Sequence, residues 1–276
     1  MGMLRLHFER RNGATLLASS EHAPPLQVVR AFPSEGGALV HLHNLSGGVL
    51  GGDRLETLIE VGAGAEAQVT STGATRIYRH RGAAPATAVT QIAIGEDGLL
   101  EYIPDPIIPY ARARYVQRTV IELAPGAGLF WWEICAPGRE ARGEVFAYEL
   151  LEFHFELGAS GTPLALERLR IEPSLRPPSS PARLGTFRYW ATFYVCRAGV
   201  DQARWRELET ELAELANRLS RAGETLWAAS ALARGGVALR VVARNGLEIP
   251  RGLAGFWRAA KLRLYGREPV LPRKVN

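Results

Sequence analysis

Short runs of alternating or β-branched apolar residues, separated by glycine and proline, dominate the chain from Leu26 to about Cys196. Such runs are typical of β-strands, because successive side chains of a strand point to opposite faces of a sheet. Examples are ALVHLHN, RLETLIEV, TAVTQIAI, YVQRTVIEL, GEVFAYELLEFHFEL and FRYWATFYV. No repeat of fixed length emerges, so neither a propeller nor a regular solenoid is predicted. The pattern predicts a mainly β fold of many short strands, in an extended, stacked-sheet or β-superhelical arrangement.

The C-terminal third departs from this pattern and predicts two α-helices. The first runs from Asp201 to Ala222, since Asp201 can cap its N-terminus and Gly223 can end it. Its apolar residues recur at intervals of three and four and form one narrow stripe: Trp205, Leu208, Leu212, Leu215 and Leu219. Such a stripe more often packs a helix on its own sheet. The alternative is a partner-binding surface made by Trp205, Leu208 and Leu212.

The second helix is expected from Leu253 to Tyr265, and a proline-containing basic tail, GREPVLPRKVN, follows it. Arg273 in this tail is a candidate contact for a partner protein. The Pro/Ser segment from Glu172 to Pro181 is interpreted as a long surface loop, because strand-like sequence continues on both sides of it. We therefore interpret residues 1–276 as a single domain.

Composition agrees with one folded unit. Of the 276 residues, 47% are hydrophobic and 22% are charged, which allows a large core without a metal or disulfide. The two cysteines, Cys135 and Cys196, lie in apolar strand-like segments, where a reduced and buried thiol is the commonest state. The chain shows no signal peptide and no run of 18 apolar residues, so we expect a cytoplasmic protein that does not enter a membrane.

The balance of charged residues does not by itself indicate a function. The net charge is +5, but the arginines are intermixed with 28 acidic residues, and no RNP, zinc-finger or helix-turn-helix signature accompanies them. We therefore expect no nucleic-acid partner, and a basic nucleic-acid-binding module is kept only as an alternative. Acidic protein surfaces would suit the same charge.

The segment GGVLGGD, residues 47–53, resembles a phosphate-binding loop because paired glycines let backbone amides approach a ligand closely. It lacks the Gly-Lys-Ser/Thr that contacts phosphates and magnesium, and the dinucleotide spacing is absent. A tight turn between strands is the simpler interpretation. Asp53 then caps the turn or faces a cavity. The glycines that would build the turn are Gly47, Gly48, Gly51 and Gly52.

Candidate catalytic and metal-binding groups are sparse. His41 and His43 alternate on one strand and could bind a metal together, but an ordinary half-exposed strand face is the commoner arrangement. No Gly-x-Ser-x-Gly elbow is present, and neither cysteine has a nucleophile signature. Covalent catalysis therefore has no candidate residue.

Carboxylates are the remaining chemical groups. Five of them lie in or beside apolar strand segments: Glu101, Asp105, Glu133, Glu144 and Glu167. Burial of a carboxylate is costly without a partner, so a structural ion pair is the first interpretation of each, with Arg139 as the local partner of Glu144. A carboxylate-dependent hydrolase of the β class is the alternative, and it would require two acids at glycosidase spacing.

Several segments, taken in order, resemble the urease accessory protein UreD (UreH) family. They are LSGGVLGGD (45–53), TSTGATRIYR (70–79), LEYIPDPIIPYARARYVQ (100–117), GREARGE (138–144) and GREPVLPR (266–273). The resemblance extends over most of the chain. It implies a mainly β fold with two helices and a non-catalytic maturation chaperone. Its implied partners are the urease apoprotein, UreF, and UreG through UreF. The sequence leaves open whether the chain forms a homodimer within such a complex.

The resemblance also implies passage of nickel to urease without a stably bound cofactor. Carboxylates and occasional imidazoles bind Ni²⁺ through labile contacts, whereas clustered thiolates would tend to trap it. We therefore hypothesise that an internal polar route for transient Ni²⁺ is lined or supported by five residues: Asp53, Thr75, Glu133, Glu144 and Glu167.

Overall fold

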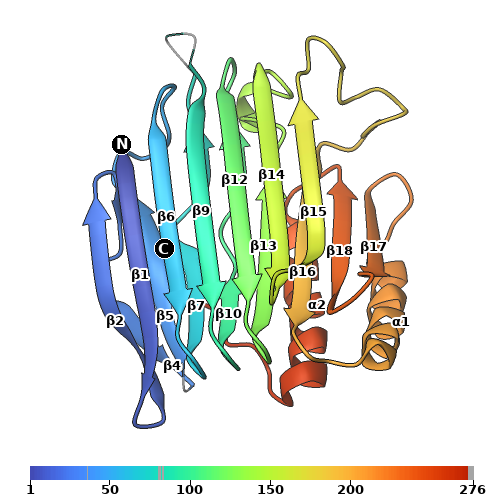
Figure 1. Ribbon diagram of the computed structural model, residues 1–276. Helices are drawn as coiled ribbons and strands as arrows, with labels where there is room; N and C mark the ends of the chain where they lie inside the picture. Colours follow the sequence, from blue (N-terminus) through green and yellow to red (C-terminus); the bar gives the residue numbers. More distant parts are fainter. Residues whose placement is uncertain (36, 80–81, 83, 273–276) are drawn as a thin grey trace.

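The computed structural model describes residues 1–35, 37–79, 82 and 84–272, and two facing β-sheets make up most of it (Figure 1). The first sheet has seven strands. In spatial order they are β15 (Thr162–Ile171), β14 (Leu150–Ala159), β12 (Arg114–Leu123), β9 (Ala86–Ile94), β6 (Arg54–Val61), β1 (Gly2–Arg11) and β2 (Ala14–Ala23). A long loop between β15 and the second sheet contains the predicted Pro/Ser loop.

The second sheet has eleven strands. Its main path is β17 (Thr225–Ala231), β18 (Gly236–Ala243), β16 (Tyr189–Arg197), β13 (Gly128–Cys135), β10 (Leu99–Tyr102), β7 (Glu66–Ser71), β5 (Gly37–Asn44) and β3 (Leu26–Gln27). Off this path lie β4 (Ala31–Ser34), β8 (Thr75–Ile77) and β11 (Ile107–Pro109).

From β5 to β14 the chain passes back and forth between the two sheets and stacks parallel strands in each. This arrangement confirms the mainly β, stacked-sheet prediction. Register partners in the first sheet are Val61, Ile94, Leu123 and Ala159, which are unequally spaced along the sequence. The turns between sheets differ in length, and this is why the sequence shows no fixed repeat.

The strands extend beyond the predicted range at both ends. The hairpin of β1 and β2 precedes Leu26, and β17 and β18 follow Cys196. In β1 the alternating Leu4, Leu6 and Phe8 are each at most 1% exposed. The alternation was therefore present in the sequence, and the prediction that the strands begin at Leu26 was too narrow.

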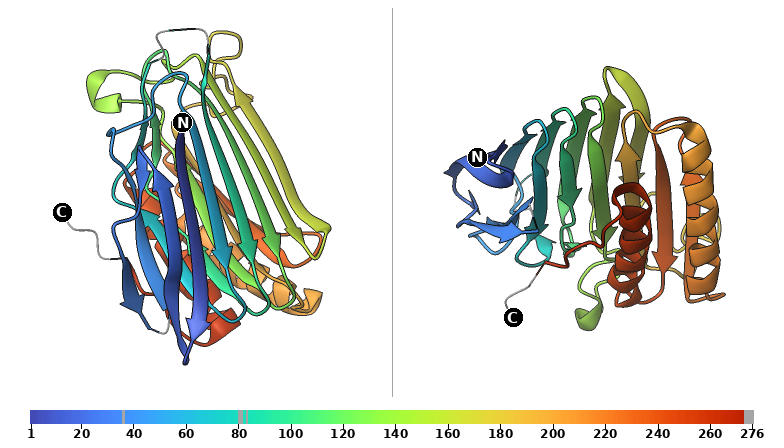
Figure 2. Two further views of the ribbon diagram at one scale, coloured as in Figure 1. Left: turned by 60° about the vertical axis from the view of Figure 1, so that its left-hand side comes forward. Right: turned by 90° about the horizontal axis from the view of Figure 1, so that it is seen from below.

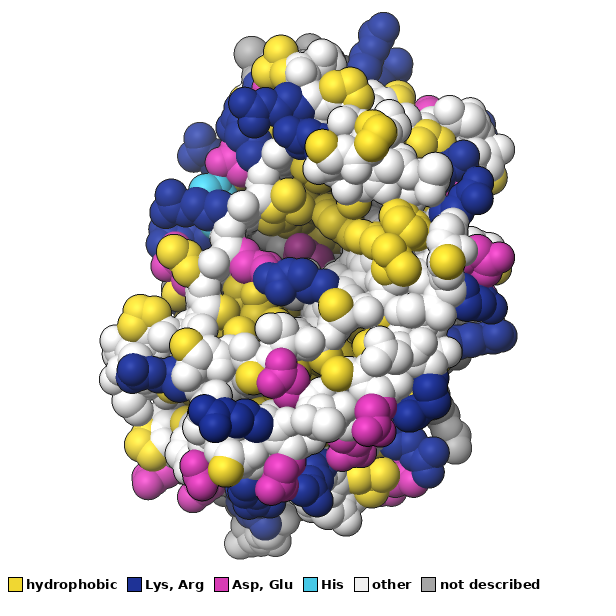
Figure 3. Space-filling view, turned by 90° about the vertical axis from the view of Figure 1, so that its right-hand side faces the viewer, with side chains coloured by type: hydrophobic (Ala, Val, Ile, Leu, Met, Phe, Trp, Pro, Cys, Tyr) yellow, Lys and Arg dark blue, Asp and Glu magenta, His cyan; other side chains and the backbone are white. Residues whose placement is uncertain are grey.

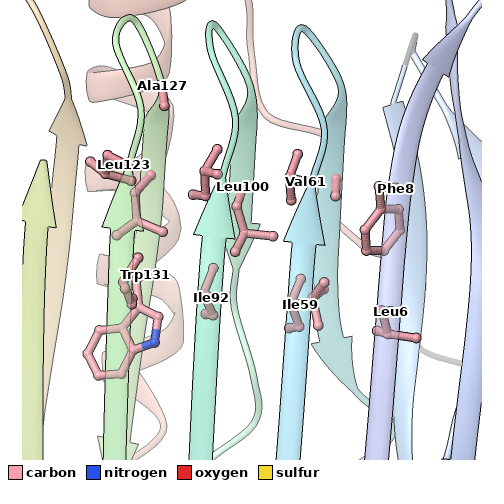
Figure 4. Packing of buried hydrophobic residues seen from close by; sticks show 14 of the residues in the cluster. Leu6, Phe8, Ile59, Val61, Ile92, Leu100, Leu123, Ala127 and Trp131 are labelled. Carbon is pink, nitrogen blue, oxygen red and sulfur yellow. The ribbon is translucent and has the colours of Figure 1, made fainter. Parts of the chain in front are cut away.

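The core lies between the sheets (Figure 4). Alternate side chains of each strand point inward, because the side-chain period of a strand is two residues. The figure shows Leu6 and Phe8 of β1 beside Ile59 and Val61 of β6, with Trp131 of β13 on the opposing sheet. Cys135 and Cys196 are free, buried thiols, as predicted.

Two helices cover the face of the second sheet that is turned away from the first: α1 (Gln202–Leu219) and α2 (Glu248–Tyr265) (Figure 2). Asp201 caps α1 as predicted, since its carboxylate accepts a hydrogen bond of 3.2 Å from the Ala203 N–H. The predicted end at Gly223 is wrong, because Ser220 terminates the helix and its Oγ accepts a 2.8 Å bond from the Trp227 N–H.

Helix α2 begins at Glu248, before the predicted Leu253. Pro250 lies in its first turn, where proline leaves no intrahelical bond unmade. A Cβ at Gly252 would lie 2.3 Å from Trp227 Cζ2, so this glycine permits the close packing of α2 on β17. Of the helices in the described part of the chain, neither combines the length and apolar character needed to cross a membrane.

The apolar stripe of α1 is part of the core. Trp205, Leu208 and Leu212 are each 0% exposed and belong to the cluster formed with β17, β18 and α2. Packing on the chain's own sheet is therefore confirmed. The alternative that these three side chains form a partner-binding surface is wrong, because no partner can reach them without unfolding the helix.

Replacement of Leu208 by alanine is expected to lower the free energy of unfolding by about 3 kcal/mol, through lost apolar burial and the cavity left behind. Chemical denaturation of the purified protein measures this change. Glu211→Ala on the exposed face of the same helix serves as the control and should change stability by less than about 0.5 kcal/mol. Unchanged stability in Leu208→Ala would contradict the packing described above.

Candidate functional site

A cavity of about 330 Å³ lies between the two sheets, near the ends of β5 and β7. The first sheet contributes Thr57, Thr90 and Thr119 to its wall, and the second sheet contributes Glu133. The 45–53 turn and the segment before β8 also line the cavity. Apolar surface makes up most of the cavity wall, so polar groups are a minority of its lining.

Strand geometry explains why Glu133 lies in this cavity. In the segment WWEIC, Trp131, Glu133 and Cys135 alternate toward the first sheet, whereas Trp132 and Ile134 pack toward the helices. A strand that is apolar on both faces therefore carries one carboxylate on its inner face. The sequence alone shows the alternation but not which face is which.

Glu133 has an unusual environment for a carboxylate. Its side chain accepts a hydrogen bond from the Gln117 amide, and the Tyr115 hydroxyl donates to Gln117 Oε1 at 3.0 Å. Among the residues that the structure describes, no arginine, lysine or histidine lies within ion-pair distance of it. Burial raises the pKa of Glu133 to about 7, and the Gln117 hydrogen bond opposes this only in part. The carboxyl group therefore exchanges its proton near neutral pH.

Other oxygen and nitrogen donors line the same cavity, including Thr75, Asp105 and His43. The Ser71 hydroxyl donates to Asp105 Oδ2 at 3.1 Å, which orients that carboxylate. Burial lowers the pKa of His43, with a further contribution from His41, so its ring favours the neutral form that binds metals. His41 instead lies edge-on against Phe32, with ring centroids 5.8 Å apart.

No thiolate accompanies these donors. Burial raises the pKa of the Cys135 thiol well above its usual range, and the nearby Glu133 raises it further. A protonated thiol is a poor metal ligand. Within the described ranges, no three His, Cys, Asp or Glu side chains gather as a metal-holding cluster.

The structure places the predicted route residues in different positions. Thr75 and Glu133 line the same cavity. Asp53 lies in the 45–53 turn, where its Oδ2 accepts a 2.8 Å hydrogen bond from the Leu50 N–H. Glu144 lines a separate hollow, and Glu167 pairs with Arg240 of β18 across the open edge between the sheets. Figure 3 shows that face hollowed, with apolar side chains in its depth and charged groups beside them.

The glycine-rich segment is a tight turn, as predicted. Gly47 and Gly52 adopt φ values of 72° and 87°, which side chains with a Cβ rarely adopt, and Gly51 lies between them in the turn. A Cβ on Gly48 would lie 2.5 Å from Tyr78 Cε2 and 2.6 Å from the Arg76 carbonyl oxygen. Glycine at this position therefore lets the turn pack closely against β8 beside the cavity.

Three of the five strand carboxylates form ion pairs, which confirms the structural interpretation for them. Arg139 pairs with Glu144, Arg240 with Glu167, and Lys261 with Glu101 at 2.8 Å. Glu133 differs from these three, because an amide is its hydrogen-bond donor. Because no cation among the described residues neutralises its carboxylate, Glu133 is the principal candidate functional residue.

Sequence reasoning did not identify Gln117 or Tyr115, which hold Glu133 in place. Both lie in an ordinary strand segment, and only the inter-sheet contact reveals them. The candidate partner contact Arg273 lies outside the described residues. The preceding tail is anchored, since Arg267 pairs with Glu66 and the Val270 carbonyl accepts a 2.8 Å bond from Gln68 Nε2.

Comparison with known proteins adds independent information. Residues 1–276 match the family model described as UreD urease accessory protein. A urease accessory protein UreD from Herpetosiphon aurantiacus is 46% identical over 275 residues, covering 99% of this chain and 96% of the relative. Similar proteins from Ralstonia nicotianae (UreD) and Brucella ovis (UreD 2) are 34% and 30% identical, covering 95% of this chain and 89% and 87% of the relatives.

Proposed function

Since the chain belongs to the UreD family of urease accessory proteins, and so has a role in urease maturation, we propose that it binds the urease apoprotein and UreF, and UreG through UreF. In such a complex it assists delivery of Ni²⁺ to the urease active site. Nickel is cargo in this role, and the chain retains no cofactor. We further propose that the role is non-catalytic and is carried out in the cytoplasm.

The observation that carries this proposal is Glu133, a carboxylate with no cationic partner among the described residues, in a cavity that other oxygen and nitrogen donors also line. A metal ligand must lose its proton to bind, so a carboxyl group with a pKa of about 7 couples nickel capture to proton release. Oxygen donors exchange Ni²⁺ more readily than thiolates do, which suits transfer better than storage.

Thr75 shares the cavity with Glu133 and would offer its hydroxyl oxygen as a further ligand. Asp53, Glu144 and Glu167 lie nearer the surface and remain the proposed supporting positions of the route. In this proposal Ni²⁺ reaches the cavity past the 45–53 turn. A continuous internal route through all five positions is a prediction.

The two alternative functions predict different experimental results. A carboxylate-dependent hydrolase would show turnover in an assay panel of glycosides and esters. A nucleic-acid-binding module would show salt-sensitive binding whose slope counts phosphate contacts. Neither accounts for a family match over the whole chain.

Co-expression with urease subunits, UreF and UreG, followed by affinity capture through this chain and nickel quantification of urease, tests the proposal. We expect capture of urease and UreF together, and urease that contains nickel only when this chain is present. Capture of neither protein, or equal nickel content without this chain, would contradict it.

A further inference from the structure

A second hollow, of about 590 Å³, opens on the surface where the 45–53 turn, the end of β8 and the 138–144 segment meet. Its wall includes Leu50, Tyr78, Tyr110, Arg79 and Arg112. The described residues that line it do not line the cavity of Glu133, so the two hollows are separate features. We refer to it as the Tyr78/Tyr110 hollow.

One wall of the hollow consists of two packed tyrosine rings and a neutralised ion pair. The Tyr78 and Tyr110 rings meet edge to face with centroids 5.0 Å apart, and the Arg139 guanidinium stacks on the Tyr110 ring at 4.1 Å. The same guanidinium donates to both carboxylate oxygens of Glu144. This hydrogen bonding holds the pKa of Glu144 below its usual range, so the pair stays charged and mutually neutralised.

Two other arginines of the hollow are not neutralised. Arg79 and Arg112 are exposed, and in the part of the chain that the structure describes no carboxylate lies within ion-pair distance of either. They give the hollow excess positive charge. Leu50, which is 51% exposed, adds an apolar surface next to the two tyrosines.

The backbone at Arg112 adds a second observation. Its φ is +62°, a left-handed conformation that is unfavourable for a residue with a Cβ. Hydrogen bonds of the Arg112 N–H to the Ala147 carbonyl (2.8 Å) and of the Ala113 N–H to the Tyr110 carbonyl (3.0 Å) fix this turn. Glycine would fit the conformation without strain. The turn therefore fixes the position from which the Arg112 side chain lines the hollow.

We propose that the Tyr78/Tyr110 hollow docks an acidic segment of a partner protein. A carboxylate of that segment would bind at Arg79 and Arg112, and an adjacent apolar side chain would cover the tyrosine rings and Leu50. Exposed arginine and tyrosine around an apolar centre are the residues that carry most binding energy at protein interfaces. Charge complementarity selects an acidic partner because Arg79 and Arg112 leave the hollow with excess positive charge, and the apolar centre suits a protein side chain better than a phosphate backbone.

The proposal rests on the proposed function, since the partner would be urease or UreF. The test titrates the full-length chain against purified urease apoprotein and against UreF by calorimetry. Arg112→Gly removes the guanidinium and relieves the backbone strain, so it should fold at least as well as the native chain. We expect about tenfold weaker binding to one of the two proteins, and about hundredfold with Arg79→Ser added. Added salt should weaken binding by the native chain more than by the double variant.

Two controls match these changes. Asn12→Gly makes the same type of backbone change at φ +51°, in the β1–β2 turn at the opposite end of the strands (Figure 1). Arg234→Ser removes an exposed cation from the β17–β18 turn. Both should bind as the native chain does.

Native-like binding by the double variant, or equal weakening by Arg234→Ser, would overturn the hollow's role and leave the proposed function intact. Loss of binding to a 20-base-pair DNA duplex in the double variant, with protein binding unchanged, would assign the hollow to phosphates and overturn the proposal. No binding by the native chain to either protein would overturn the proposed function and this inference together.

Discussion

Replacing Glu133 with glutamine is expected to reduce nickel incorporation into urease by about a hundredfold, at the upper end of what loss of one metal-site group costs. The amide keeps the size of the side chain, and its oxygen can still accept from Gln117. It has no negative charge for Ni²⁺ and no proton to release. The measurement is the nickel content of urease purified from cells that express the variant together with the other maturation proteins.

The same substitution should make the protein more stable at high pH. Burial raises the pKa of Glu133 to about 7 from a usual value of 4.5, so the unfolded chain loses this proton first. The free energy of unfolding is therefore unaffected below pH 4.5. It falls as pH rises from 4.5 to about 7, and it stays reduced above pH 7. The reduction is at most about 3 kcal/mol, because the cavity gives the carboxylate some access to water. Glu133→Gln should remove it at pH 8 and change little at pH 4.5.

A matched control separates this effect from a general loss of charge. Glu56→Gln removes an exposed carboxylate from β6 and should change neither nickel incorporation nor the pH dependence of stability. Nickel incorporation equal to that of the native chain in Glu133→Gln would remove Glu133 from the proposed route. A stability difference that does not vary with pH would show that its carboxylate is not the titrating group.

The fold could be predicted in outline because its strands follow local rules. Alternation marked the strands, and the apolar stripe marked α1, since these patterns depend only on which face of an element is buried. The sheet order could not be predicted. Register partners such as Ile59 and Ile92 come together through turns of irregular length, and no local signal records their pairing.

The site was predicted only in part for the same reason. Acids in apolar strands could be recognised from the sequence, but whether each has a cation nearby depends on contacts between distant segments. Arg139 and Glu144 are five residues apart and could be paired by inspection. Glu101 and Lys261 lie on β10 and α2, and Gln117 reaches Glu133 across the two sheets. Distinguishing structural acids from a candidate functional acid therefore required the three-dimensional structure.

The buried pair of Glu101 and Lys261 leads to the second large expected effect. The two side chains are 8% and 6% exposed, and the Trp257 indole N–H donates to the same Glu101 oxygen at 2.7 Å. Burial raises the pKa of Glu101, and Lys261 opposes this as the nearest cation. Lys261→Met would leave the carboxylate buried without its ion-pair partner, with Arg267 as a remaining but weaker cationic influence. We expect the free energy of unfolding to fall by about 4 kcal/mol at pH 8.

The loss in Lys261→Met should be smaller at pH 5, because Glu101 can then take up a proton and become neutral. Urea denaturation at both pH values measures this difference. Arg258→Met, on the same helix, removes the exposed partner of Glu268 and should cost less than about 1 kcal/mol at either pH. Similar losses in the two variants would show that Lys261 contributes no more than a surface cation.

Adding Glu101→Gln to Lys261→Met separates the ion pair from packing. The glutamine oxygen can still accept from the Trp257 indole, and no buried charge remains. Most of the lost stability should therefore return, because replacing both members of a buried ion pair is often nearly neutral whereas removing one is not. If the double variant is as unstable as Lys261→Met alone, the loss comes from the packing of α2 on β10, and the carboxylate is not its cause.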